Sequence, residues 1–403
     1  MLSEFKHKKI RDWCLFDFGI SSYPTLVITF IYGAFYAKEI AITPEIGTSN
    51  WGYAISTGSI LSFLIFLLVI FKGNKNKNLG IRFFKLSFYS LILSVSLLYC
   101  FDKESNEYLP LIFIAISFVA FEIINLFYNL SLHNVSENEK RGLISNLGWA
   151  TGYLGGLLSL ISVLAILSLT ELNDYKVFGQ SIFLLIGPFV GLWTFVFGLK
   201  HINNYKNKVF KIVNFSSFFK NIKINSINKF FVSYFFFNNA VICIFAFASM
   251  IASFLFGFSE KEILKLGIFI NLFGIIGCLS LGKIEDKVGS EKIVLTCIVF
   301  LLLITFTLYF INDTKIFWLL SLMIGFFIGP IQAASRSVLA KKLKSENQLS
   351  AFCVYSMFGN ICSILGPFLV SLVISISSDI RQGLLVIPLF FVISLLPFVK
   401  TNV

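Results

Sequence analysis

The chain has 403 residues, of which 57% are hydrophobic and 13% are charged, and its formal net charge is +12. Soluble domains carry about 25% charged residues, so this composition excludes an ordinary soluble protein and indicates a polytopic membrane protein. The positive charge does not favour nucleic-acid binding, because the basic residues are scattered through short loops, where membrane insertion alone gathers them. The partner that such loops predict is the anionic membrane surface.

Twelve apolar blocks follow one another along the chain, and we expect each to be a transmembrane helix. They cover residues 16–37, 50–71, 83–101, 109–132, 144–169, 181–199, 230–256, 263–281, 293–311, 316–339, 349–376 and 383–399. A helix needs about 20 apolar residues to span the hydrocarbon core, and most blocks have that length. Only helices satisfy every backbone polar group within one segment in lipid, so the predicted fold class is all-α and polytopic.

The basic residues alternate between the two sides of this layout. Seven of the 33 Lys and Arg residues lie in the odd-numbered loops, and the other 26 lie at the N-terminus, in the even-numbered loops or near the cytoplasmic helix ends. The middle loop, residues 200–229, has seven lysines and no acid. Because cytoplasmic loops are enriched in Lys and Arg, we expect both termini in the cytoplasm and the chain in the cytoplasmic membrane.

The two halves of the chain show traces of an internal repeat. Gly73 and Gly282 are 209 residues apart, as are Gly80 and Gly289, and the tripeptide at 136–138 returns at 345–347 with the same offset. Parallel halves of six helices are the arrangement of the major facilitator fold, in which helices 1, 4, 7 and 10 line a central cavity. The predicted organisation is a bundle at 1–199, a basic cytoplasmic linker at 200–229 and a second bundle at 230–403.

The loop after the eighth block resembles the major facilitator signature G-x-x-x-D-[RK]-x-G-x-x-[RK]. Its five positions hold Gly282, Asp286, Lys287, Gly289 and Lys292. An acid here can lie against the N-terminus of a neighbouring helix, where the helix dipole favours negative charge. The resemblance implies a cytoplasmic gate. The alternative is an ordinary basic loop.

Several stretches resemble one branch of that superfamily, the UMF1 transporters, which include the autophagy-related vacuolar amino-acid effluxers of fungi and their bacterial relatives. They are W-C-L-F-D-F-G-I-S-S-Y at 13–23, F-E and F-Y-N within 121–129, G-W-A-T-G-Y-L-G-G at 148–156, G-P-I-Q-A-A-S-R-S at 329–337 and the Gly359–Pro367 stretch. The resemblance implies a transporter of a small polar solute, with amino-acid efflux as the implied activity.

This chain departs from the branch at two positions that bear on mechanism. It has Asn239 in the seventh block, where relatives have Asp, and Asn360 in the eleventh, where they have Lys. We hypothesise that a buried ion pair has been replaced by two neutral hydrogen-bonding groups, since loss of one partner alone would strand a charge.

Two acids lie inside apolar blocks that are expected to line the cavity. Asp17 is followed by Ser21 and Thr25 at intervals of four, and Glu122 shares a helical face with Asn125 and Asn129. Buried ionisable groups are costly in a membrane, so either acid is a candidate to bind a proton or a cationic group of the solute. The alternative is that each acid only holds neighbouring helices together.

Further polar groups come from Asn238 and Asn239 in the seventh block and from Gln332 and Arg336 in the tenth. The carboxylate of a zwitterionic solute would need a positive partner, for which Arg336 or a broken helix end is the candidate. The alternative for Arg336 is an interfacial residue bound to lipid phosphate or a loop carbonyl.

The sequence argues against an enzyme. All three histidines lie in predicted loops, the seven cysteines form no C-x-x-C pair, and no phosphate-binding G-x-x-x-x-G-K-[ST] loop occurs. We expect no cofactor and no metal. The predicted function is secondary active transport by alternating access, coupled to protons, in a monomer. The alternative is a sensor or scaffold that keeps the transporter fold without transport.

Overall fold

The computed structural model describes residues 2–42, 44–72, 79–102, 104–169, 176–177, 180–204, 225–258, 260–343, 345–377 and 379–399. The α-helices of the first half are α1 (Leu2–Phe5), α2 (Lys8–Ile20), α3 (Tyr32–Phe35), α4 (Pro44–Lys72), α5 (Leu79–Ser96), α6 (Tyr108–Val135), α7 (Arg141–Leu169) and α8 (Ile186–Asn204). Those of the second half are α10 (Asn225–Met250), α11 (Glu260–Val288), α12 (Ser290–Phe310), α13 (Thr314–Lys342), α14 (Ser345–Ser377), α15 (Ile380–Leu384) and α16 (Val386–Val399).

The remaining elements are short. π-Helical segments occur at η1 (Tyr23–Phe30), η2 (Tyr36–Ile40) and η6 (Ile251–Leu255), and 3₁₀ turns at η3 (Leu97–Cys100), η4 (Asn138–Lys140) and η5 (Ile182–Leu185). Strands β1 (Lys176–Val177) and β2 (Gln180–Ser181) pair antiparallel. The predicted all-α class is therefore confirmed, apart from this one small hairpin.

Ten stretches within the described ranges are long and apolar enough to cross a membrane. Two of the twelve predicted crossings are not among them. The block at 16–37 is divided among α2, η1, α3 and η2. The block at 144–169 lies within the single helix α7, whose 29 residues exceed the length of a span. An integral membrane protein with helical spans is thus supported, and the count of twelve remains a prediction.

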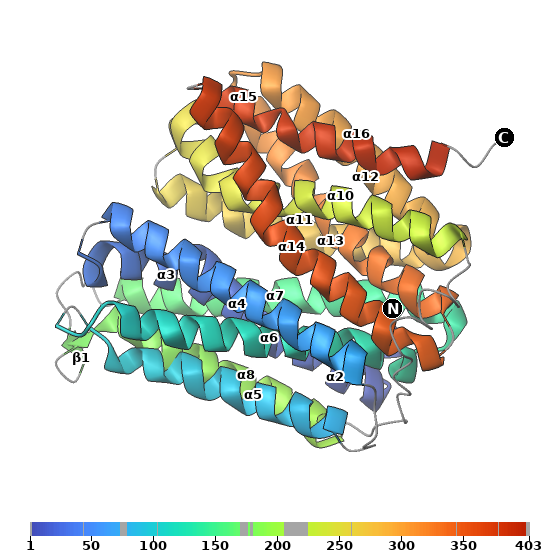
Figure 1. Cartoon of the computed structure of the whole chain (residues 1–403), viewed down its shortest axis with the longest axis horizontal. Helices are drawn as coiled ribbons and strands as arrows, with labels where there is room; N and C mark the ends of the chain where they lie inside the picture. Colours follow the sequence, from blue (N-terminus) through green and yellow to red (C-terminus); the bar gives the residue numbers. More distant parts are fainter. Residues whose placement is uncertain are drawn as a thin grey trace.

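The helices form two groups. The first, α2 to α8, lies in the lower part of Figure 1, and the second, α10 to α16, lies above it. Contacts between the groups join α7 to α11 and α13, and α14 to α4 and α6. We call the end at which α2 begins and α13 ends the latch end, and the opposite end, which carries β1, the β1 end (Figure 1).

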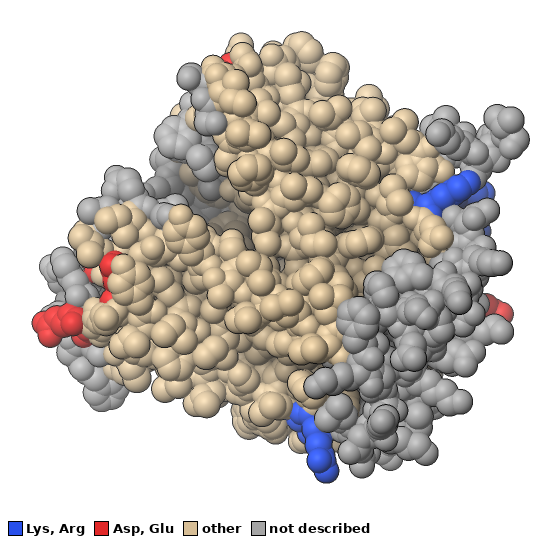
Figure 2. Space-filling model, viewed as in Figure 1, with Lys and Arg blue, Asp and Glu red and all other residues tan. Residues whose placement is uncertain are grey.

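The surface in Figure 2 has the charge distribution of a membrane protein. Its broad middle shows neither Lys and Arg nor Asp and Glu, and the charged side chains appear at the periphery. The surface is hollowed between the two groups on the side of the β1 end (Figure 2).

The expected polar stripe on the first block is interrupted. The α-helical spacing of four residues holds from Asp17 through Ser21 to Thr25, but changes further along η1, which begins next to Pro24. Proline has no backbone N–H to donate, and a π-helical turn is wider than an α-helical one, so later side chains rotate away from the stripe. Thr29, the next position expected in the stripe at the interval of four, is accordingly exposed.

Some sequence predictions lie outside the described residues. Most of the basic linker falls at 205–224, and the first-half counterpart of the gate loop falls at 73–78. The domain boundaries at 199 and 229 remain predictions.

Candidate functional site

Arg336 on α13 connects the two groups of helices. It is 2% exposed, and its Nε donates to the Ser145 hydroxyl at 3.0 Å. Its terminal nitrogens donate to the Ser145 carbonyl at 2.6 Å and to Asn129 Oδ1 at 3.2 Å. Ser145 and Asn129 belong to the first group. Arg336 therefore binds protein oxygens, a backbone carbonyl among them, in a buried contact, and its role toward a solute remains a prediction.

Two stacked aromatic rings lie beneath this guanidinium. The rings of Trp13 and Tyr128 are 4.5 Å apart at 14°. The guanidinium carbon of Arg336 lies 4.9 Å from the Trp13 ring centre and 5.2 Å from that of Tyr128. Cations are attracted to aromatic faces at such distances, so the rings help to stabilise the buried charge.

Asp17 contacts the same cluster from α2. Its Oδ2 accepts a hydrogen bond of 2.9 Å from the Tyr128 hydroxyl, and its Oδ1 accepts one of 3.3 Å from Ser21. Thr25 donates to the Ser21 carbonyl at 2.8 Å. The structure therefore brings the three predicted residues of this stripe together.

A face of glycines on α7 makes room for the stripe. A Cβ atom at Gly152 would lie 2.9 Å from the Ser21 hydroxyl and 3.0 Å from Asp17 Oδ1. A Cβ at Gly155 would overlap the backbone carbonyl of Phe18. Small residues allow helices in membranes to approach this closely.

On the predicted polar face of α6, one side chain of three makes a hydrogen bond to a described residue. Asn129 binds Arg336. Glu122 and Asn125 are half-buried and make no side-chain hydrogen bond or ion pair within the described part of the chain. Glu122 interacts electrostatically with Tyr23 in the first group and Tyr234 in the second. Glu122 lies on α6 seven residues before Asn129, the α6 residue that binds Arg336.

The predicted amides of the second group form a network among α10, α13 and α14. Gln332 donates to Asn238 Oδ1 at 3.1 Å and accepts from Tyr355 at 3.4 Å. Asn239 donates to the Phe235 carbonyl at 2.7 Å and contacts the Cys362 sulfur at 3.0 Å.

Asn239 and Asn360 are 0% and 4% exposed, but the structure shows no hydrogen bond between them among its described residues. Each has one buried atom without a partner there, the acceptor Oδ1 of Asn239 and the donor Nδ2 of Asn360. The hypothesis of an exchanged ion pair remains a prediction.

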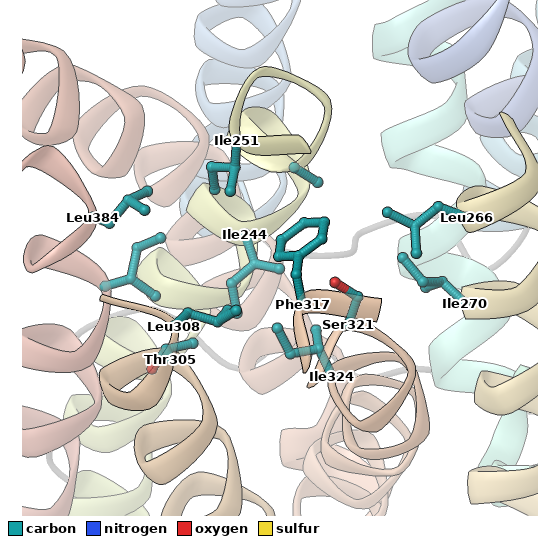
Figure 3. A pocket seen from close by; sticks show the side chains of 12 residues that line it. Ile244, Ile251, Leu266, Ile270, Thr305, Leu308, Phe317, Ser321, Ile324 and Leu384 are labelled. Carbon is teal, nitrogen blue, oxygen red and sulfur yellow. The ribbon is translucent and has the colours of Figure 1, made fainter. Parts of the chain in front are cut away.

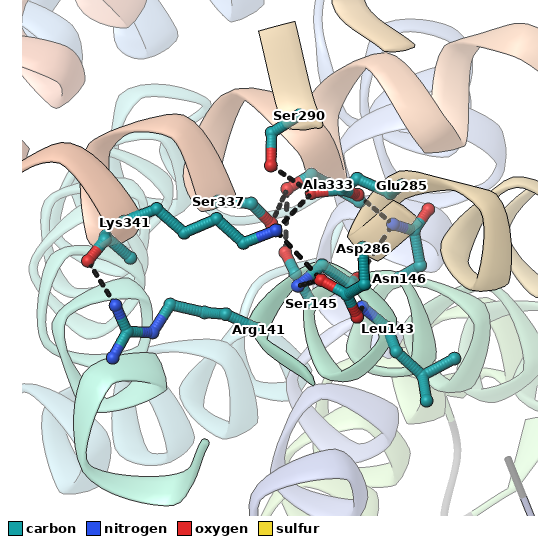
Figure 4. A network of polar contacts seen from close by, with 12 residues as sticks. Arg141, Leu143, Ser145, Asn146, Glu285, Asp286, Ser290, Ala333, Ser337 and Lys341 are labelled. Carbon is teal, nitrogen blue, oxygen red and sulfur yellow. Dashed lines mark hydrogen bonds and ion pairs between the residues drawn. The ribbon is translucent and has the colours of Figure 1, made fainter. Parts of the chain in front are cut away.

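Asp286 lies against the first turn of α7 (Figure 4). Its two carboxylate oxygens each accept a 2.8 Å hydrogen bond, one from the backbone N–H of Gly142 and one from that of Leu143. Gly282 allows the approach, because a Cβ there would lie 2.6 Å from Asn146. Gly289 has φ +99, a left-handed conformation that favours glycine, immediately before α12.

Lys287 and Lys292 are exposed and form no ion pair with any residue that the structure describes. The cation beside Asp286 is instead Lys341 on α13, with Nζ at 2.8 Å. We name the contact of Asp286 with Gly142, Leu143 and Lys341 the latch.

Sequence reasoning missed several residues of this interface. Glu285 is fully buried and accepts bonds from Asn146 at 2.5 Å and Ser290 at 2.6 Å. Arg141 donates to the carbonyl of Ala340 at 2.6 Å (Figure 4). Glu285 adjoins Asp286 in sequence, which was an available signal. Arg141 offered none, because its partner is a backbone oxygen 199 residues away.

An apolar cavity of about 60 Å³ lies among α10, α11, α12, α13 and α16 (Figure 3). Side chains such as Leu266, Phe317 and Ile324 line it, and its polar groups are the hydroxyls of Thr305 and Ser321. None of the predicted site residues lines it, and it offers no charge to a polar solute. Within the described ranges, no cluster of His, Cys, Asp and Glu has the arrangement of a metal site.

Comparisons with known proteins agree with this geometry. The chain is 24% identical over 407 residues to the uncharacterized MFS-type transporter YxiO of Bacillus subtilis (strain 168), covering 96% of this chain and 93% of the relative. It is 25% identical over 129 residues to the proton-coupled antiporter flippase LtaA of Staphylococcus aureus (strain N315), covering 30% and 33% of the two chains. These relatives are transporters and not enzymes.

Among solved structures, the major facilitator transporter FucP in its outward conformation superposes with a TM-score of 0.78 at 10% identity, over 98% of this chain and 99% of FucP. This likeness shows the fold. Residues 128–403, more than half of the chain, match the family described as vacuole effluxer Atg22 like. The chain therefore belongs to the Atg22-like vacuole effluxer family, within the major facilitator superfamily of transporters.

Proposed function

We propose that this protein is a proton-coupled secondary transporter that moves a small polar solute across the cytoplasmic membrane by alternating access, as a monomer. Amino acids are the candidate solutes, from the family resemblance. The observation that carries the proposal is the buried contact of Arg336 with Ser145 and Asn129, which joins the two groups of helices near the latch end. A polar contact of this kind can separate and hydrate, as alternating access requires.

In this conformation Arg336 and the latch join the two groups at the latch end, and the hollow lies toward the β1 end (Figure 2). With the termini placed in the cytoplasm by the positive-inside rule, this state is outward-facing. Arg336 is then fully engaged by protein oxygens. Its proposed role as a partner for a solute carboxylate therefore belongs to the state in which the two groups have separated at the latch end.

Glu122 is the candidate for the ammonium group or for the transported proton. It is half-buried between the groups and without an ionic partner among the described residues, so a cation would compensate its charge. Asp17 is the second candidate for a proton, because its carboxylate already contacts the interface through Tyr128.

The test is loss of an isotope-labelled mixture of amino acids from proteoliposomes, with and without an imposed pH gradient. Selective, gradient-dependent loss is expected, and Asp17→Asn and Glu122→Gln should abolish the dependence singly or together. Unchanged gradient-driven transport in both variants would contradict the proton-carrier role. No loss beyond empty liposomes, from folded protein, would remove amino acids as solutes. The search would then turn to other metabolites and afterwards to a sensor or scaffold role.

A further inference from the structure

We propose that Tyr128 is a positioning residue that transmits the protonation state of Asp17 to the contact between the two groups of helices. The inference rests on the proposed proton-coupled function and names the side chain that links the proton to the movement. Tyr128 is suited to this because its hydroxyl and its ring contact different charged groups.

The hydroxyl contacts the anion and the ring contacts the cation. The hydroxyl donates to Asp17 Oδ2 at 2.9 Å, on α2 of the first group. The ring face lies 5.2 Å from the guanidinium carbon of Arg336, on α13 of the second group. Tyr128 itself is 2% exposed. A change at the carboxylate therefore reaches the guanidinium through one buried side chain.

The surroundings of Tyr128 leave it little freedom to absorb such a change. Trp13 stacks on its ring and is itself fixed by a 2.7 Å hydrogen bond to Ser131. On the α7 side, a Cβ at Gly148 would lie 2.7 Å from the Tyr128 hydroxyl and 2.6 Å from the Trp13 ring. Close-packed groups of this kind transmit displacement instead of deforming gradually.

The sign of the effect follows from the charges. Arg336 forms no ion pair within 4.0 Å among the described residues, so its buried charge is balanced by neutral oxygens, by two ring faces and by Asp17 at longer range. An ionised Asp17 stabilises this arrangement. Protonation of Asp17 removes the negative charge and weakens the hydrogen bond from Tyr128, because charge-assisted bonds are the stronger ones. Acidification should therefore favour separation at the latch end.

Other titratable groups face Asp17 and must be considered. They come from each element packed around it: Cys14 on α2, Tyr153 on α7, Cys278 on α11, and Arg336 on α13. At their ordinary values none of these four groups changes charge between about pH 5 and about pH 8, apart from the thiols near the upper limit. Two further titratable groups, Glu285 and Asp286, lie at the latch. The variants of Asp17 and Tyr128 distinguish their effect from that of Asp17, because these variants leave both latch carboxylates unchanged.

The experiment measures the separation of the latch end in the full-length protein in lipid nanodiscs. Cysteines for spin labels replace Glu139 and Val288, which lie in different groups and are exposed. Cys100, the one exposed cysteine of the seven, is replaced by serine. The ratio of separated to closed protein is read from distance distributions between about pH 8 and about pH 5. No solute is needed, so failure of transport and failure of this response are distinct results.

The unmodified interface should show a rise in the ratio of about fivefold or more on acidification. Tyr128→Phe keeps the ring but removes the hydroxyl, and the response should fall below about twofold. Asp17→Asn should hold the ratio near its acid value at every pH. Tyr23→Phe is the matched control, since it removes another buried tyrosine hydroxyl, bonded to Ser117 at 2.9 Å, and should keep the full response.

Trp13→Phe provides a second route if Tyr128→Phe does not fold. It weakens the ring stack but leaves the bond between Tyr128 and Asp17, so separation should increase at all pH values with the response retained. A full response in Tyr128→Phe would overturn the proposal. A full response in Asp17→Asn would overturn it too, and would assign the titration to the latch carboxylates instead. The absence of any response in the unmodified interface would overturn it as well.

Discussion

Replacing Asp286 by asparagine should loosen the first turn of α7. The carboxylate accepts 2.8 Å bonds from the backbone N–H groups of Gly142 and Leu143 and pairs with Lys341. Asparagine has the same shape but only one acceptor oxygen, and its NH₂ group would face the second backbone N–H. One charged hydrogen bond therefore becomes neutral and the other is lost.

The size of the effect can be worked out from these contacts. Hydrogen bonds to charged groups contribute about 1.5 to 3 kcal/mol, against about 1 kcal/mol for neutral ones. The lost interaction with the helix dipole adds about 0.3 to 1 kcal/mol. The Asp286 side chain is 15% exposed, so solvent screens it little. We expect opening of this turn to become easier by about 2 to 3 kcal/mol, or about 30- to 150-fold, after allowing for new contacts of the amide.

Hydrogen exchange of the peptide that contains Gly142 and Leu143 measures this opening directly. Glu291→Gln is the matched control, because Glu291 pairs with Lys342 inside the second group and is 37% exposed. Loss of such an exposed pair costs less than about 1 kcal/mol and should leave the α7 peptide protected. Equal exchange in the two variants would refute the assignment of Asp286 as the residue that holds α7.

Three further predictions follow from burial and contacts. Gly155→Ala should lower the free energy of unfolding by about 1 to 3 kcal/mol, because the new Cβ atom would overlap the facing backbone. Gly52→Ala is the control and should be neutral or stabilising, because a Cβ atom there would meet no heavy atom within 4 Å. Equal shifts of the thermal midpoint in the two variants would contradict this prediction. Asn239→Asp and Asn360→Lys should each reduce folded yield, and the double variant should recover part of it; additive damage would exclude a pair. The hydrogen bond from Lys140 lowers the pKa of the Glu4 carboxyl. The stability that this pair contributes is therefore present at neutral pH, and it is lost as the pH falls from about 4.5 through the lowered pKa. Proteolysis between α1 and α2 should increase over that range, and Glu4→Gln should be cleaved readily at every pH.

The fold class was accessible from the sequence because lipid imposes a simple rule. A long apolar run has to be a helix, so block boundaries predict helix boundaries to within a few residues, as for 109–132 against α6 at Tyr108–Val135. The family resemblance, which depended on short motifs such as that at 329–337, is confirmed by the family match over residues 128–403. The π-helical segment η1 was not predictable from spacing, because the i, i+4 pattern continues through it.

The partners of the site residues were less accessible. Arg336 was named as a candidate, but its contacts with Ser145 and Trp13 join positions 191 and more than 300 residues apart in sequence. Trp13 and Tyr128 occur in the family motifs, but the sequence did not predict that their rings stack, because stacking depends on the packing of α2 against α6. Lys341 was missed because it lies on α13, 55 residues from Asp286 in sequence, and nothing in the loop signature points to it. Periodicity gives the face of one helix and does not give the helix that lies opposite.

The chemical character of the interface agrees with reversible closure. The latch end joins the groups through a buried guanidinium, a buried carboxylate and backbone groups of a helix N-terminus. A buried polar contact is balanced between desolvation and pairing, so its net stabilisation is small compared with that of an apolar surface of equal area. When the groups separate, water replaces each partner, and little free energy is lost. An apolar seam at the same place would hold the closed state more firmly, and a small difference between the two states is the condition under which the proposed proton on Asp17 would shift the equilibrium.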